Sequence, residues 1–526
     1  MTATTAPTTT LTLPEPDPAP DRDLLPRRAV SPWLLLLPVG ILLALLPPVI
    51  TGAAILAAAA AAVLLARPRW ALYLLALTVP YQSGFRLGEA SISLDIALGQ
   101  VNVSVTEGVV LLLLVGWLTQ IAAGRAPRPA LTPLVGAAAF LLTGLALSAL
   151  VASDLALAAK ELLKWVELAA VYLAGTSLLQ TREQRRTLAL WLLAAAFSQA
   201  LVGLLQSFAR IGPEHFLIGG VIMRAYGTFE QPNPFGGYLG LHLPLAVSLV
   251  CFGLAAGRSR RIGFVVVAVI GFALLITLSR GAWTAQVVAL LIVVLAGSRS
   301  ARHLVMTFGV LGLIIGVAVW PILPAELTAR AVSVVSSVVD LGSVQDAAIT
   351  PDNWAVMERQ SQWYAGWQMF SANPLLGVGI GNYNAAYDDY RLDQWPVALG
   401  HAHNHYLTIA AEAGLVGLTG YIAFLVVAFR SAMQAVRTHR RLGDREATAV
   451  ALGILGALAA FATHNLFDVM FVHGMGVTVG LLLALLYVPS SVANPTAPSP
   501  LPGAASRWRG APQTIKTITT DEERSA

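Results

Sequence analysis

Residues Leu131–Val151 read LTPLVGAAAFLLTGLALSALV, a run of 21 residues without a charged side chain. A helix needs about 20 mostly apolar residues to cross a bilayer. Inside the bilayer the backbone polar groups must be hydrogen-bonded within the segment, so a helix is the default conformation. Similar runs recur along the chain, as in Gly263–Leu278, and the alternating pattern of a membrane barrel is absent. The sequence therefore predicts an all-α, polytopic membrane protein.

The composition agrees with a membrane protein. Of the 526 residues, 56% are hydrophobic and 12% are charged, against about 25% charged in soluble domains. Cys251 is the single cysteine, which excludes an intrachain disulfide and a cysteine-based metal cluster. The formal charge of +5 comes mostly from arginines in short loops. We interpret these arginines as determinants of membrane orientation rather than as nucleic-acid contacts.

We expect about fourteen transmembrane helices, divided by one long loop. Their approximate limits are 33–49, 51–66, 70–83, 105–123, 131–152, 156–179, 187–209, 235–256, 262–278, 281–297, 303–322, 404–429, 446–465 and 469–488. This pattern gives N-terminal membrane helices within 31–322, a loop or cap at 323–403, and C-terminal membrane helices within 404–489. Residues 1–30 and 490–526 lack apolar periodicity, and we expect them to be disordered tails.

The arginines predict the orientation. Six clusters fall on the same side of the expected helices: Arg67 and Arg69; Arg125 and Arg128; Arg182, Arg185 and Arg186; Arg258, Arg260 and Arg261; Arg299 and Arg302; and Arg430, Arg437, Arg440, Arg441 and Arg445. By the positive-inside rule this side is cytoplasmic. We therefore expect both termini in the cytoplasm, a location in the plasma (inner) membrane, and the 323–403 loop on the external or periplasmic face.

The 323–403 segment is rich in Trp and Tyr, residues that suit a folded cap on the membrane interface. Met357–Phe370 is expected to form an interfacial helix that ends at Asn373-Pro374. A loop of this length is uncommon unless it is functional or disordered. Chemistry is therefore expected on the external face.

The most distinctive local pattern is His401-Ala402-His403-Asn404-His405, where the long loop enters a membrane helix. Alternating histidines suggest zinc, but a helical segment would turn His403 away from the other two, and no HExxH pattern supplies further ligands. We favour an acid or base role, because an imidazole with a pKa near 6.5 accepts a proton near neutral pH. Histidines that only hydrogen-bond at a helix entrance remain the simpler alternative.

Arginines in two external segments are candidate phosphate contacts. Arg280 lies in the short turn Thr277–Gly281 between two apolar runs, where a charged side chain needs an anionic partner. Its planar guanidinium suits phosphate, although it would also suit lipid headgroups. Arg224 and Asn233 belong to a second segment, rich in turn formers, that opens a membrane helix. A re-entry loop without a ligand is the alternative there.

Other polar residues complete the candidate substrate-binding set. Lys164 lies in an apolar run beside Lys160, Glu161 and Glu167, where it marks either a polar cavity or a purely structural ion pair. Arg359, Asn404 and His405 are further candidates from the long loop and its exit. Phosphate-binding and nucleotide-binding fingerprints are absent. We therefore expect no nucleotide, metal or other cofactor, and infer a donor that is activated before it reaches the protein.

Several of these residues together resemble the O-antigen ligase and polymerase family. The resemblance rests on Gly227-Thr228-Phe229 with Asn233-Pro234, on Ser279-Arg280-Gly281, on Asn373–Gly379, and on His403-Asn404 with Gly414 and Gly417. It implies a GT-C-type membrane glycosyltransferase of cell-envelope polysaccharide biosynthesis. Such enzymes transfer a glycan from undecaprenyl pyrophosphate to a glycan, lipid or protein acceptor on the external face, without a metal.

The resemblance also implies roles for single residues. His403 would be the general base for the acceptor hydroxyl, and Arg280 and Arg224 would neutralise the leaving pyrophosphate. From its sequence distance alone, Glu412, nine residues after His403, would orient that histidine or cap the cavity. The alternative functions are a secondary transporter, which usually shows related halves, and a non-catalytic polysaccharide assembly factor.

Overall fold

The computed structural model describes residues 48–81, 85–87, 90–92, 96–98, 101–297, 328 and 354–488. The expected tails, the expected helix 303–322 and nearly all of 33–49 lie outside these residues. The chain divides into two compact units, Met1–Ala62 and Val63–Ala526. The described part of the first unit is the beginning of helix α2 (Pro48–Ala66). All that follows concerns the second unit.

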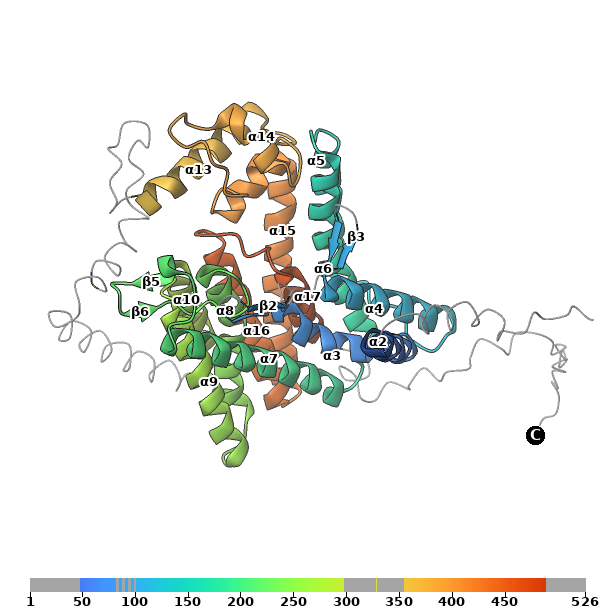
Figure 1. The fold of residues 1–526 in the computed structure, drawn as a ribbon. Helices are drawn as coiled ribbons and strands as arrows, with labels where there is room; N and C mark the ends of the chain where they lie inside the picture. Colours follow the sequence, from blue (N-terminus) through green and yellow to red (C-terminus); the bar gives the residue numbers. More distant parts are fainter. Residues whose placement is uncertain are drawn as a thin grey trace, which may run out of the picture. The chain divides into compact units, whose positions relative to one another are not determined.

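The described part of this unit is mainly helical (Figure 1). Its helices are α3 (Arg69–Thr78), α4 (Val105–Ala122), α5 (Pro133–Ala149), α6 (Leu155–Leu178), α7 (Arg182–Phe208), α8 (Pro232–Ser248), α9 (Arg258–Ile276), α10 (Arg280–Gly297), α13 (Trp354–Ala372), α14 (Tyr383–Tyr390), α15 (His405–Arg441), α16 (Arg445–His464) and α17 (Met475–Leu485). Single turns follow α3 (η1, Val79–Tyr81), follow α8 (η3, Leu249–Gly253) and precede β5 (η2, Glu214–Phe216). Short strands form three antiparallel hairpins, which are β1–β2 (Phe85–Leu87, Ala90–Ile92), β3–β4 (Ile96–Leu98, Val101–Val103) and β5–β6 (Leu217–Ile218, Ile222–Met223).

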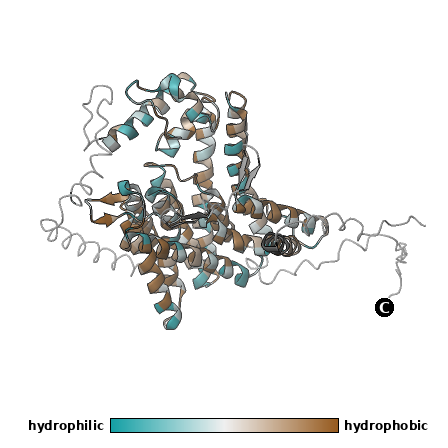
Figure 2. Cartoon of the chain, viewed as in Figure 1, coloured by the Kyte–Doolittle hydropathy of each residue, from teal (hydrophilic) through white to brown (hydrophobic). Residues whose placement is uncertain are grey.

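Among the described residues, seven helices are long and apolar enough to cross a membrane: α4, α7, α8 with η3, α9, α10, α15 and α16. Figure 2 shows the brown, hydrophobic character of these helices. The expected helical membrane protein is thus confirmed in outline, whereas the count of fourteen spans is not. Helix α3 has 10 residues and α17 has 11, both shorter than the roughly 20 that a span needs.

Helix α16 is central to the packing, because it contacts α8, α10 and α15. Its residue Gly453 lies so close to α8 that an added Cβ would come within 2.5 Å of the Leu245 Cα. Small residues allow membrane helices to approach in this way. Helix α5 packs on the other side of α15, and α17 packs on α6.

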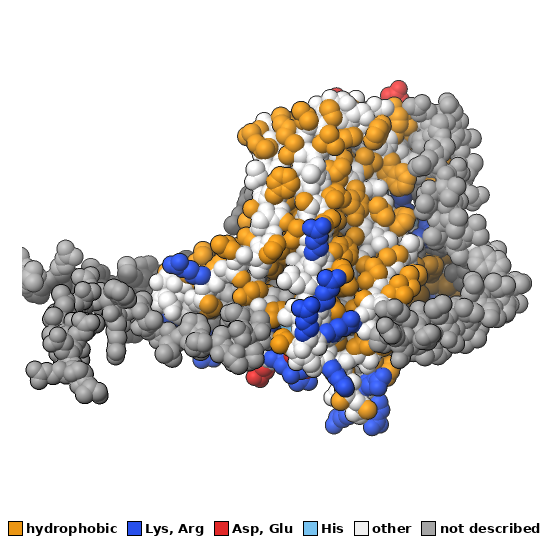
Figure 3. Space-filling view, turned by 180° about the vertical axis from the view of Figure 1, so that it is seen from behind, with side chains coloured by type: hydrophobic (Ala, Val, Ile, Leu, Met, Phe, Trp, Pro, Cys, Tyr) orange, Lys and Arg blue, Asp and Glu red, His pale blue; other side chains and the backbone are white. Residues whose placement is uncertain are grey.

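The two ends of α15 differ in character. Helices α13 and α14 lie beside its first turns (Figure 1), and both contact it. The last turn contains His439, Arg440 and Arg441, and the neighbouring helices α7 and α16 begin with Arg182 and Arg445. In Figure 3, Lys and Arg side chains gather toward the lower end of a largely hydrophobic face. We refer to the two ends as the cap end and the arginine-rich end.

Helix α15 is broken at Gly414, where φ is 61° and ψ is −161°. An added Cβ at this glycine would lie 2.3 Å from the backbone of Leu375, so only glycine fits. The segment after α13 docks into the break. The Val378 N–H donates to the Ala411 carbonyl at 3.0 Å, and the Leu415 N–H donates to the Pro374 carbonyl at 2.8 Å. The Asn373–Gly379 motif and Gly414 are therefore two halves of one structural joint.

Candidate active site

A small polar pocket of about 40 Å³ lies at the cap end and is lined mainly by residues from four segments that are distant in the sequence. It brings together Arg224 and Asn233 from the segment that opens α8, Arg280 from the first turn of α10, and Arg359 from α13. Asp468, which follows α16, also lines it. Four of the residues selected from the sequence thus meet at one place. The arrangement concentrates three guanidinium groups around one carboxylate.

Hydrogen bonds connect these groups in a chain. The Arg224 Nε donates to the Thr277 carbonyl at 2.8 Å, and its terminal nitrogen donates to the Asn233 Oδ1 at 3.0 Å. The Asn233 Nδ2 donates to the Asp468 Oδ2 at 3.0 Å. Because arginine only donates, it fixes the orientation of the Asn233 amide, and that amide then presents a donor to the carboxylate.

His403 lies at the end of this chain. Its Nδ1 is 3.3 Å from the Asp468 Oδ1, and its backbone N–H donates to the His401 Nδ1 at 3.1 Å. A carboxylate beside Nδ1 holds the proton on that nitrogen and leaves Nε2 as a proton acceptor. His403 with Asp468 therefore has the arrangement of an oriented general base.

The backbone is strained beside the pocket. His403 has a φ of 48° and Leu278, two residues before Arg280, has a φ of 49°. Non-glycine residues rarely adopt this left-handed conformation, which costs about 1–3 kcal/mol and tends to occur at functional sites. The fold thus maintains two unfavourable conformations at the two loops that present His403 and Arg280.

The helix at this position begins at His405, so residues 401–404 are not helical, contrary to the arrangement considered for zinc. His401 and His403 lie side by side, with ring centroids 4.5 Å apart. Together with Asp468 they offer three ligand atoms within 4.8 Å of one another. This donor set fits a divalent metal ion as well as a proton relay. Chemical tests must therefore address both.

Burial and neighbouring charges together determine the pKa values of Asp468 and His401, which lie in the loops at the site. Burial alone would raise the pKa of Asp468, but the hydrogen bond with His403 and the charges of His403, His401 and Arg359 hold that pKa well below its usual value. Burial lowers the pKa of His401 to about 4, with Asp468 opposing the shift and Lys164 adding to it. At neutral pH the site therefore contains an ionised Asp468 and a neutral His401.

Asn404, His405 and Lys164, like His403, are not among the residues that line the pocket. Asn404 caps α15, since its side chain accepts from the Leu407 N–H at 3.1 Å. The ring of His405 is buried and stacks on Trp165 and Phe471. Lys164 pairs with Glu161 at 2.5 Å, rather than with Glu167.

The Glu412 carboxylate accepts from the Tyr383 N–H at 3.1 Å, and the carboxylate that accepts from the His403 Nδ1 is that of Asp468 instead. Asp468 was not selected from the sequence. One signal could have found it: it is an acidic residue between the expected helices 446–465 and 469–488, and a charged residue between two apolar runs is the same argument that selected Arg280.

The fold and the site define a helical membrane protein with an arginine-rich polar pocket beside a His–Asp pair. A family model described as O-Antigen ligase matches residues 264–422, and this match confirms the resemblance to the O-antigen ligase family. The matched segment includes Arg280, Arg359 and His403, while Arg224, Asn233 and Asp468 lie outside it. No curated protein matches the chain.

Proposed function

We propose that the protein is a GT-C-type membrane glycosyltransferase that transfers or polymerises a glycan. The donor is a saccharide linked to undecaprenyl pyrophosphate, and the acceptor is a hydroxyl of a glycan, a lipid or a protein at the external face. The observation that carries the proposal is that three arginines line one polar pocket together with Asp468, and that this Asp468 also hydrogen-bonds with His403. These are the groups that a pyrophosphate leaving group and a hydroxyl nucleophile require.

His403 acts as the general base. With its Nδ1 proton held toward Asp468, its Nε2 takes the proton of the acceptor hydroxyl as the oxygen attacks the anomeric carbon. The bond between that carbon and the pyrophosphate oxygen breaks on the opposite side, so the configuration inverts. A positioned general base of this kind contributes about 10²–10⁴-fold to the rate.

Arg224, Arg280 and Arg359 stabilise the leaving group. Negative charge develops on the pyrophosphate as the glycosidic bond breaks, and preorganised cations at that position lower the barrier. A guanidinium binds two phosphate oxygens at once. Arg359 comes from α13 and the other two from the membrane helices and their loops, so donor binding also connects the cap to the bundle.

The test uses the purified full chain in proteoliposomes with a polyprenyl-pyrophosphate-linked glycan and a range of acceptors. We expect transfer by the wild type and a loss of about 10²–10⁴-fold in His403→Gln. Binding of the donor should be retained, because the arginines are intact. His405→Gln serves as a matched control, since its ring is packed among aromatic residues.

Two further measurements distinguish the alternatives. Chelation should leave transfer unchanged; loss of transfer that added zinc restores would instead assign His401, His403 and Asp468 as metal ligands. Substrate flux without any lipid-linked donor would identify a transporter. Transfer that is equal in wild type and His403→Gln would rule out the proposed base.

A further inference from the structure

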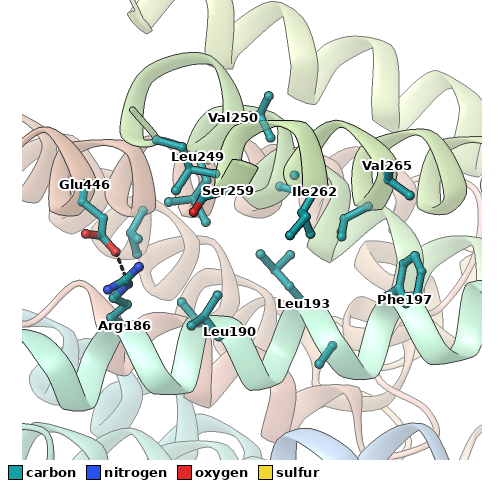
Figure 4. Close-up of a pocket in the computed structure, with 17 residues that line it drawn as sticks. Arg186, Leu190, Leu193, Phe197, Leu249, Val250, Ser259, Ile262, Val265 and Glu446 are labelled. Atoms are coloured by element: carbon teal, nitrogen blue, oxygen red, sulfur yellow. Dashed lines mark ion pairs between the residues drawn. The ribbon is translucent and has the colours of Figure 1, made fainter. Parts of the chain in front are cut away.

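A second site lies at the arginine-rich end, in a cavity of about 470 Å³ between α7, α9 and the end of α8. Figure 4 shows Leu190, Leu193 and Phe197 on one wall and Ile262 and Val265 on the other. The volume is within the roughly 300–1,000 Å³ of typical ligand sites. Nearly all of the wall is apolar, which suits a hydrocarbon chain.

The cavity opens sideways between two helices that are able to span the membrane. Leu190 of α7 is 53% exposed, and Ile262 and Val265 of α9 are 54% and 57% exposed. On such helices these side chains face lipid. A molecule can therefore enter from the bilayer without passing through water.

One end of the cavity is charged. Arg186 and Glu446 form an ion pair of 2.9 Å there (Figure 4), and both residues also line a neighbouring pocket of about 120 Å³ that has several charged residues in its lining. That pocket contains three guanidinium groups, from Arg182, Arg185 and Arg186, against the two carboxylates of Asp444 and Glu446. The apolar cavity thus adjoins a pocket whose arginines exceed its carboxylates by one.

Arg185 provides that excess charge. Arg182 pairs with Asp444 at 3.0 Å and Arg186 pairs with Glu446 at 2.9 Å. Among the residues that the structure describes, Arg185 has no carboxylate within 4.0 Å, and it donates a long hydrogen bond of 3.4 Å to the Leu179 carbonyl. A half-buried guanidinium in this position is suited to a phosphate oxygen.

We propose that this is a binding site for an anionic phospholipid, with the phosphate in the arginine pocket and one acyl chain in the cavity. A monoanionic headgroup matches the single excess charge, which a neutral zwitterionic headgroup does not. Basic pockets between membrane helices recognise acidic headgroups in this way. The proposal goes beyond the proposed function, since α16, with its 20 residues, separates Glu446 from the active-site loop by roughly 30 Å.

The experiment titrates the delipidated, purified full chain with single lipids and measures bound lipid by native mass spectrometry. Phosphatidylglycerol is compared with phosphatidylcholine of the same acyl chains and with a C55 polyprenyl phosphate. We expect the wild type to prefer phosphatidylglycerol. Arg185→Gln should reduce this preference about fivefold, the factor expected from roughly 1 kcal/mol per basic residue near a membrane, and Arg185→Lys should retain most of it.

Ala194→Trp tests the cavity separately, because Ala194 is an exposed residue in its lining and the larger ring fills the space. It should weaken binding of both phospholipids. Matched controls are Arg128→Gln, an exposed arginine elsewhere, and Leu201→Trp, an exposed α7 position outside the cavity lining. Three results would each overturn the proposal. The first is equal binding of the two phospholipids, and the second is equal binding by Arg185→Gln and Arg128→Gln. The third is selective binding of polyprenyl phosphate that is lost in Ala194→Trp. Glycan transfer is not measured, so the outcome is independent of the proposed function.

Discussion

The exchange Asp468→Asn alters one atom of the hydrogen-bonded chain that holds His403. The Asp468 carboxylate accepts from the His403 Nδ1 at 3.3 Å, from the Asn233 Nδ2 at 3.0 Å and from the Val469 N–H at 2.9 Å. All three partners donate when His403 carries its proton on Nδ1. An asparagine at this position has only one accepting oxygen, so it cannot satisfy both sides.

No rotation of the neighbouring amides restores a matching set of donors and acceptors around position 468. If the oxygen of the new amide at position 468 faces His403, the NH₂ group of that new amide faces the NH₂ group of Asn233, and two donors meet. Rotating the Asn233 amide would remove this clash but would place the NH₂ group of Asn233 against Arg224, which only donates. If the new NH₂ group instead faces His403, it fixes the proton on Nε2, where the histidine cannot act as a base. A wrong tautomer of this kind costs about 10⁴-fold in the serine-protease triad.

We therefore expect Asp468→Asn to reduce glycan transfer by about 10²–10⁴-fold, with donor binding nearly unchanged. One unsatisfied buried donor would also destabilise the fold by about 1–3 kcal/mol. Initial rates in proteoliposomes, donor binding and thermal unfolding in detergent measure the three effects. The control is Asp393→Asn, the same change at a fully exposed carboxylate of the cap. Transfer within threefold of the wild type, in a stably expressed Asp468→Asn protein, would refute the role of the His–Asp pair.

Three further predictions follow from the site and its surroundings. Arg280→Lys should lower transfer by about 10–100-fold, because it retains the charge but loses two-point contact with phosphate; normal rates would argue against a phosphate contact. The pKa of His401 is lowered from 6.5 to about 4, so the unfolded chain binds a proton that the folded site resists, and stability falls as the pH decreases between these values. His401→Asn should remove that part of the acid sensitivity in thermal unfolding between pH 7.5 and 4, and an unchanged pH profile would contradict it. In a Cys251→Ser background, a cysteine introduced by Val397→Cys, at a 67% exposed position, should react with an impermeant thiol reagent in spheroplasts. A cysteine introduced by Arg128→Cys should not react. The reverse labelling would show that the membrane orientation is opposite to the one expected.

The apolar runs predicted the limits of a helix well where charged or turn-forming residues lie at both ends of the run. Helix α4 (Val105–Ala122) corresponds to the expected 105–123, and α16 (Arg445–His464) corresponds to 446–465. The expected span 469–488 was too long, because only Met475–Leu485 is helical and all eleven of these residues are buried by the protein. Hydropathy does not distinguish burial in lipid from burial in protein, so it overestimates the length of such helices.

Residues of the candidate site could be selected from the sequence where the type of a single residue was sufficient for the argument. An arginine between apolar segments needs an anion wherever it lies, so Arg280 and Arg224 could be selected without knowing the fold. Asp468 and His403 are 65 positions apart, and their meeting depends on the hairpin of α15 and α16, where the His405 N–H donates to the Asn465 carbonyl at 2.8 Å. No local pattern encodes such a contact. The expectation for Glu412 relied on sequence distance alone, whereas the break at Gly414 directs its carboxylate toward Tyr383.

The break in α15 also sets where this protein can be divided. The Gly379 N–H donates to the Glu412 carbonyl at 2.9 Å and the Tyr383 N–H donates to the Glu412 carboxylate at 3.1 Å, so the first turns of α15 are bonded to the cap. A chimera that exchanges the cap between two such proteins should therefore carry the segment from α13 through Gly414 as one unit. A junction placed at His405, where the helix begins, would separate the two halves of this joint and misplace the loop that presents His403.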